Sequence, residues 1–108
     1  MQTVIVLNQD QMGHGDRALG QRILATFLRK SIALRELDAL VFYNTGVRLL
    51  APDSPLLGEL RALEERGVDL VPCGTCLQHF GITPAAGAVS DMDAILQRLE
   101  RAAKVITL

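Results

Sequence analysis

The chain of 108 residues has little cysteine, no excess of charge of either sign and no long apolar run. Both cysteines lie in one short segment, and a domain of this length buries about two-thirds of its unfolded surface, so no structural disulfide is required. Eleven basic residues against twelve acidic ones give a net charge of -1. Because this composition provides no basic patch, we expect neither nucleic acid nor an anionic membrane surface as a partner.

The apolar runs are strand-sized, far below the roughly 18 residues that a membrane-spanning helix needs. Residues 1–3 lead directly into an apolar run without the basic segment of a signal peptide. These absences predict a soluble, cytoplasmic protein. In that compartment paired cysteines stay reduced, and they more often serve catalysis or metal binding than structure.

Strand-like and helix-like segments alternate along the sequence. Four apolar runs predict buried strands, at residues 4–7, 40–43, 68–71 and 105–108. A glycine-interrupted run at 85–89 predicts a weaker strand. Three helices are expected between the strands, capped by Asp16, by Ser54 with Pro55, and by Ser90 or Asp91. The predicted fold class is α/β: one domain with an open, mostly parallel sheet and helices on both faces, a flavodoxin- or Rossmann-like three-layer sandwich.

Apolar residues at helical spacing define the expected buried faces of these helices. In the first helix they are Leu19, Ile23, Leu24, Phe27 and Leu28. In the second they are Leu56, Leu57, Leu60 and Leu63, with Gly67 ending the helix. In the last they are Ile95, Leu96, Leu99 and Ala103.

Ligands of open parallel sheets bind outside the carboxyl ends of the strands. The loops that leave those ends are residues 8–15, 44–46, 73–76 and 90–91. We therefore expect both cysteines to share a rim with three polar loops.

The most informative motif is Cys73-Gly74-Thr75-Cys76, which directly follows a predicted strand. Pro72 and Gly74 favour an open turn, and Cys73 would stand at the first turn of a helix, where free N–H groups favour the thiolate. A thiolate attacks sulfane sulfur, and a second thiol one turn later can assist it or resolve a persulfide by forming a disulfide. The alternative is that two small residues pack beneath the strand.

Other residues allow weaker interpretations. Cys73, Cys76, His14 and His79 could supply four zinc ligands across two loops, but we expect no metal and no cofactor, with His79 exposed on a helix. His14 is either a solvated loop residue or a group that polarises a ligand.

Two loops leave further alternatives. Gly13 and Gly15 lack the spacing and the lysine of a phosphate-binding loop, so a turn is favoured. Residues 44–46 (Asn44, Thr45, Gly46) provide either donors facing the Cys73 sulfur or a tight turn with left-handed backbone. Arg48 and Asp53 are predicted to lie on a solvated face.

Five segments carry a family resemblance. In chain order they are GHGD with LG (13–16, 19–20), FYNTGV (42–47), LRALEERGV (60–68), CGTCL (73–77) and SDM (90–92). Together they resemble the DsrE/DsrF-like family, most closely the C-terminal domain of YedF-type, sulfurtransferase-like proteins of selenium metabolism. The resemblance spans residues 1–108 as a single DsrE-like domain.

The resemblance implies a DsrE-like α/β fold, homo-oligomers, and Cys73 at the position of the cysteine that carries sulfane sulfur. Cys76 is then the additional thiol of the CGTC subgroup, with Gly74, Thr75, His14 and residues 44–46 in supporting positions. YedF-type proteins usually carry a TusA-like domain upstream, whereas this sequence begins at the DsrE-like domain. A separate TusA-like sulfur-carrier protein is therefore the expected donor or acceptor.

The resulting expectation is a sulfur, or selenium, relay protein that carries a cysteine persulfide; whether such a relay counts as an enzyme stays open. The alternatives are a dithiol redox protein and a non-catalytic oligomeric module with structural cysteines. Val47, Leu49 and Leu50 follow a turn and precede a helix cap, so they are expected at the surface. With Phe80 they would then pack against another copy and bring the cysteine rims together.

Overall fold

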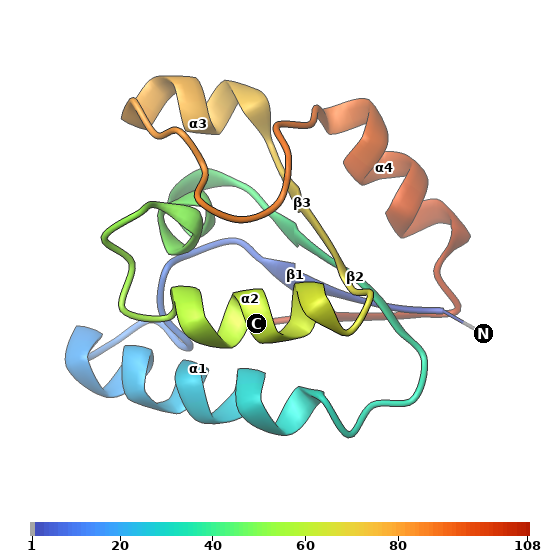
Figure 1. Ribbon diagram of the computed structural model, residues 1–108, viewed down its shortest axis with the longest axis horizontal. Coiled ribbons are helices and arrows are strands. Elements are labelled where there is room, and N and C mark those ends of the chain that lie inside the picture. The colour runs from blue at the N-terminus through green and yellow to red at the C-terminus, as the bar shows by residue number, and fades with distance from the viewer. Residues whose placement is uncertain (1) are drawn as a thin grey trace.

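Four parallel strands form one sheet in the order β3-β2-β1-β4 in the computed structural model, which describes residues 2–108 (Figure 1). The strands are β1 (Thr3–Leu7), β2 (Leu37–Phe42), β3 (Asp69–Pro72) and β4 (Lys104–Thr107). The helices are α1 (Arg17–Ser31), the 3₁₀ helix η1 (Asn44–Leu50), α2 (Leu57–Glu65), α3 (Gly74–Phe80) and α4 (Met92–Arg101). The predicted α/β fold class is confirmed.

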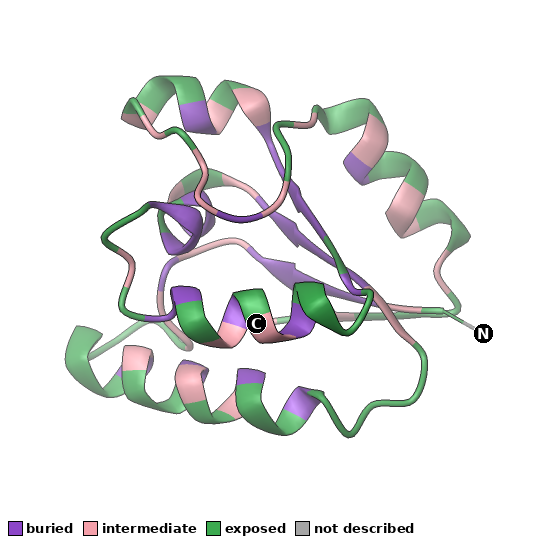
Figure 2. Ribbon diagram, in the orientation of Figure 1, coloured by how far each residue is buried: buried purple, intermediate pink, exposed green. Residues whose placement is uncertain are grey.

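Both faces of the sheet are covered, which explains the continuous apolar runs of its strands. Successive side chains of a strand point to opposite faces, so Ile5 joins the core beneath α1 and α2 whereas Val4 and Val6 join the core beneath α4. Ile95 of α4 is fully buried in that second core. The central strands are therefore buried along most of their length (Figure 2).

The predicted strand at residues 85–89 is wrong. This segment is a loop that runs along the outer edge of β3, and only Ser90 forms an isolated parallel bridge, with Cys73. Gly87 has φ +71°, and a Cβ there would lie 2.8 Å from the Leu70 carbonyl oxygen. The loop therefore approaches the strand edge closely, but its left-handed glycine cannot continue a ladder.

The predicted cap of α1 is confirmed, and of the two residues predicted as possible caps of α4 one is the cap. Asp16 accepts from the Leu19 N–H at 2.8 Å, and Asp91, not Ser90, accepts from the Ala94 N–H at 2.8 Å. The predicted cap of the second helix at Ser54 with Pro55 is wrong, since α2 begins at Leu57 after Leu56; Ser54 accepts from the Leu56 N–H at 3.2 Å in the turn that precedes the helix.

The predicted buried faces are only partly right. Leu24 and Leu28 are buried, but Leu19 and Ile23 are exposed. Leu96 of α4 is also exposed, because a residue adjacent to the buried Ile95 is rotated by about 100° around the helix. Ala103 lies beyond the end of α4.

The predicted apolar surface at Val47, Leu49 and Leu50 is wrong, since all three are buried. The segment coils into η1, which turns these side chains into the core shared with α1 and α2. Phe80 is half-buried against the same core. Over residues 2–108, no helix is both long and apolar enough to cross a membrane.

Candidate functional site

The cysteine loop lies beside the loop that follows β2, as predicted from the parallel topology. The Cys73 N–H donates to the Phe42 carbonyl at 2.9 Å, and the Gly74 N–H donates to the Ser90 carbonyl at 2.9 Å. These two bonds hold residues 73–76 against the end of β2 and against residues 90–91.

Cys73 is the residue before α3 and caps its N-terminus with extended backbone angles. It is only 4% exposed, and Pro72 is buried as well, so the turn is covered and not open as predicted. The cover is the segment around Ser90: a Cβ at position 74 would lie 2.7 Å from the Ser90 carbonyl oxygen. Gly74 therefore permits the close approach that buries Cys73.

Cys76 is half-buried, one turn further along α3, and its sulfur accepts the Asn44 N–H at 3.1 Å. Asn44 has φ +52°, a left-handed angle that asparagine tolerates better than most residues. Both interpretations of residues 44–46 thus hold in part. The turn does need a left-handed residue, but the sulfur that receives its N–H belongs to Cys76 and not to Cys73.

The surroundings of Cys76 raise the pKa of its thiol. Burial is the main cause, and the Asn44 N–H opposes it by stabilising the thiolate. Cys73 raises the Cys76 pKa further, through a hydrogen bond between the two side chains and through its charge when ionised. Both cysteines are free thiols, so the site is a dithiol in which Cys76 tends to keep its proton.

Gly46 and Thr45 complete this part of the rim. A Cβ on Gly46 would overlap the carbonyl oxygen of Leu7, so only glycine lets η1 lie this close to the end of β1. Thr45 lines a hollow of about 470 Å³ together with His14. Thr75 is exposed on the first turn of α3.

The histidines are exposed. His79 lies edge-on to the Phe80 ring, with ring centroids 4.9 Å apart. Within residues 2–108, no group of three or more histidine, cysteine, aspartate or glutamate side chains could hold a metal ion. The 8–15 loop is closed on itself instead, since Gln11 Nε2 donates to the carbonyls of Gly13 and Gly15, both at 3.1 Å.

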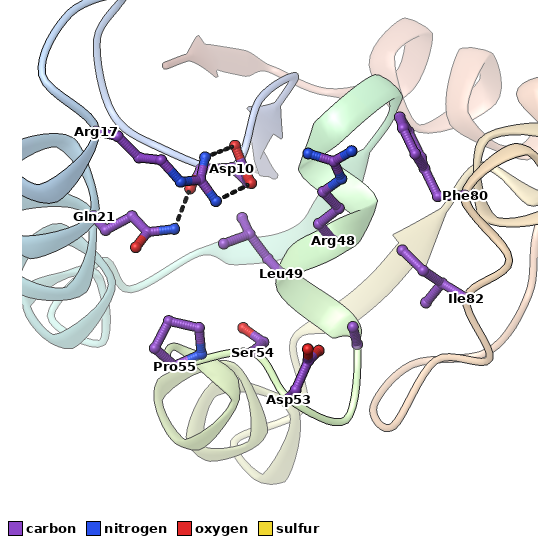
Figure 3. A pocket seen from close by; sticks show the side chains of 11 residues that line it. Asp10, Arg17, Gln21, Arg48, Leu49, Asp53, Ser54, Pro55, Phe80 and Ile82 are labelled. Carbon is purple, nitrogen blue, oxygen red and sulfur yellow. Dashed lines mark hydrogen bonds and ion pairs between the residues drawn. The ribbon is translucent and has the colours of Figure 1, made fainter.

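A charged cluster beside the rim was missed by the sequence analysis (Figure 3). Asp10 is buried, and both of its oxygens accept from the Arg17 guanidinium at 2.9 and 2.8 Å. The hydrogen bond and charge of Asp10 raise the pKa of Arg17. Arg48 lies over the Phe80 ring, 4.5 Å from its centroid. The available signal was the position of Asp10, three residues after the carboxyl end of β1.

Comparisons with known proteins agree with this architecture. A model of the DsrE/DsrF-like family matches residues 1–108. The fold is similar to that of the ychN protein from E. coli, with 19% identity, a TM-score of 0.72 and complete coverage of both chains. It is also similar to MTH1491 from Methanobacterium thermoautotrophicum, a protein of unknown function, with 24% identity, a TM-score of 0.70 and coverage of 99% and 98%.

A third similar structure is BT1422 from Bacteroides thetaiotaomicron, a conserved protein of unknown function, with 17% identity, a TM-score of 0.73 and coverage of 99% and 94%. No curated protein sequence matches significantly. At these identities the solved structures show the fold alone.

Proposed function

Because the chain belongs to the DsrE/DsrF-like family, we propose that it carries sulfane sulfur as a persulfide on Cys73 and passes it to the thiol of another protein. The observation that supports this function is the dithiol at the carboxyl rim of the sheet. Cys73 occupies the N-cap position of α3, and the Cys76 thiol is hydrogen-bonded both to it and to the Asn44 N–H. Selenium, whose chemistry is close to that of sulfur, fits the same proposal.

The transfer uses the two cysteines differently. The Cys73 thiolate attacks the outer sulfur of a donor persulfide; the donor S–S bond breaks, and the donor thiolate leaves with the electron pair. The raised pKa of Cys76 keeps that residue protonated, so it can donate a hydrogen bond to the Cys73 sulfur. Delivery is the same reaction in reverse, with an acceptor thiolate attacking the outer sulfur on Cys73.

The burial of Cys73 supports a carrier. A persulfide on a residue that is 4% exposed is shielded from water and from stray thiols. Exchange then requires a partner that fits the rim, for which a separate TusA-like sulfur-carrier protein is our proposed donor or acceptor.

A dithiol redox function is the second candidate, because the two side chains are in hydrogen-bond contact. In the absence of an acceptor, the Cys76 thiol can attack the inner sulfur of the Cys73 persulfide. This step forms the Cys73–Cys76 disulfide and releases hydrosulfide.

Mass spectrometry of the intact, reduced protein after incubation with a persulfide donor tests the proposal. The wild type is expected to gain one sulfur atom, Cys73→Ala to gain none, and Cys76→Ser to gain one sulfur and to retain it longer. Loss of two hydrogens without added sulfur would favour the redox pair. An unchanged mass would instead favour the structural module, and sulfur added to Cys76 in Cys73→Ala would reverse the assignment.

A further inference from the structure

A second feature of the rim is reached through Thr45, the residue after the one whose N–H contacts the Cys76 sulfur, and is not used by the proposed transfer. It is a hollow of about 470 Å³, here called the rim hollow, whose walls include Gln9, His14, Arg17, Thr45 and Arg48. Arg17, Arg48 and Asp10 also line a neighbouring cleft of about 320 Å³. We propose that the rim hollow binds a small sulfur oxyanion such as thiosulfate, with Arg48 as its main anion-binding group.

The charges of the rim hollow favour an anion. Its only carboxylate is Asp10, and the two-pronged ion pair with Arg17 neutralises that group. Arg48 differs, since no carboxylate among residues 2–108 lies within ion-pair distance of its guanidinium. The positive charge of Arg48 is therefore not neutralised by a carboxylate at the wall of the rim hollow.

Arg48 is also held in place. Its guanidinium lies over the Phe80 ring, an arrangement that restrains the long side chain and leaves the N–H groups at its edge available. A planar guanidinium with fixed orientation binds two oxygens of one anion in a fork geometry, which a lysine cannot do. Thr45 and Gln9 add neutral polar side chains to the same walls.

The position of the rim hollow relative to the dithiol indicates which oxyanion it binds. Phe80, under Arg48, lies four residues after Cys76 on α3, about one helical turn away. Thr45, in the wall, follows the residue whose N–H donates to the Cys76 sulfur. A thiolate and an anionic sulfur donor repel each other, and a nearby cation offsets that repulsion. Naming thiosulfate rests on the proposed function: the Cys73 thiolate would take its sulfane sulfur, the S–S bond of thiosulfate would break, and sulfite would leave with the electron pair. The anion site itself does not depend on this step.

Amide NMR titration with sodium thiosulfate at constant ionic strength tests the proposal. The protein used is the double variant Cys73→Ala, Cys76→Ser, so that binding is read without sulfur transfer. The amides of Thr45 and Arg48 are expected to shift with saturation. Arg48→Gln in the same background should weaken binding by about tenfold or more, since a hydrogen bond between charged groups contributes about 1.5–3 kcal/mol.

The matched control is Arg22→Gln, which removes the same charge from an exposed position on α1 that does not line the rim hollow. It should bind as the parent does, and sulfate should compete with thiosulfate because both present the same oxygens. Absence of saturable shifts, equal weakening by the two arginine variants, or no competition by sulfate would each overturn the anion site. Persulfide formation on Cys73 is measured separately, so either proposal can fail while the other stands.

Discussion

At the residue scale, Cys76 shows how burial and two neighbouring residues set the reactivity of one thiol. Burial and Cys73 raise its pKa, and the Asn44 N–H lowers it. A raised pKa leaves a smaller thiolate fraction at neutral pH, and only the thiolate is alkylated. The partial exposure of Cys76 therefore favours its reaction with a reagent, whereas its raised pKa slows that reaction.

Replacement of Cys73 by alanine should make Cys76 more reactive. The substitution removes the hydrogen bond and the charge of Cys73, two of the three causes that raise the Cys76 pKa, so this pKa should fall. The pH profile of iodoacetamide alkylation, followed by mass spectrometry, measures the change. The midpoint of the pH profile for alkylation of Cys76 is expected at lower pH in Cys73→Ala than in the wild type. In the wild type, which has two cysteines, peptide mapping shows which of them is modified. An unchanged or higher midpoint would contradict the coupling.

At the element scale, η1 depends on a single close contact. Gly46 lies against the Leu7 carbonyl at the end of β1, where any Cβ would overlap the oxygen. The contact brings the loop after β2 beside the loop after β1 and thereby places both Asn44 and Arg48.

Gly46→Ala should destabilise the protein strongly, by about 2 kcal/mol or more, because backbone must move to admit the methyl group. Gly58→Ala is the control: Gly58 lies in α2 with nothing within 4 Å of its Cβ position, so alanine should stabilise the helix by about 0.5–1 kcal/mol. Urea unfolding of both variants measures the difference. Comparable stability of Gly46→Ala and the wild type would show that η1 can shift at little cost.

The elements differ in how well the sequence predicts them. Residues 4–7 and 40–42 are apolar throughout because both faces of their strands are covered, and this signal is local. The burial of Val47 depends on the contact of Gly46 with Leu7, which lies far away in the sequence and leaves no periodic pattern. Glycine and small residues at 85–89 satisfy a strand pattern and a close-packed loop equally well.

Some residues of the candidate site can likewise be predicted from the sequence, and others cannot. Cys73 and Cys76 are recognisable because their spacing after a strand is itself the signal. Arg48 resembles any solvated arginine until the fold places Phe80 beneath it, 32 residues later in the sequence. Likewise, the donor for the Cys76 sulfur could be assigned only once α3 was seen against η1.

At the scale of the whole molecule, the face that carries α4 is the less completely covered one. Met92 and Leu96 lie one turn apart on α4, and Leu96 is 62% exposed. Val105 of β4 pairs with Val4 and therefore points to the same face of the sheet, where it is also exposed. Such exposed apolar side chains commonly mark contacts between subunits.

We propose that this face, in place of the buried Val47–Leu50 segment, forms the contact in a homo-oligomer. Leu96→Glu should lower the mass measured by size-exclusion chromatography with light scattering, because it places a charge in the contact. Thr26→Glu, at an exposed polar position of α1, should leave the mass unchanged. A wild type that is monomeric, or a Leu96→Glu variant of wild-type mass, would exclude the contact.

The two edges of the sheet also restrict how copies can associate. The loop at residues 85–90 covers the edge of β3, which leaves the edge of β4 as the one where strands could be added. Two copies related by a twofold axis and joined at β4 would run antiparallel, because an isologous contact reverses the strand direction. Their dithiols would then lie at opposite ends of a continuous eight-stranded sheet. An assembly in which sulfur passes between neighbouring subunits therefore has to use helix faces, and strand addition would produce independent carriers.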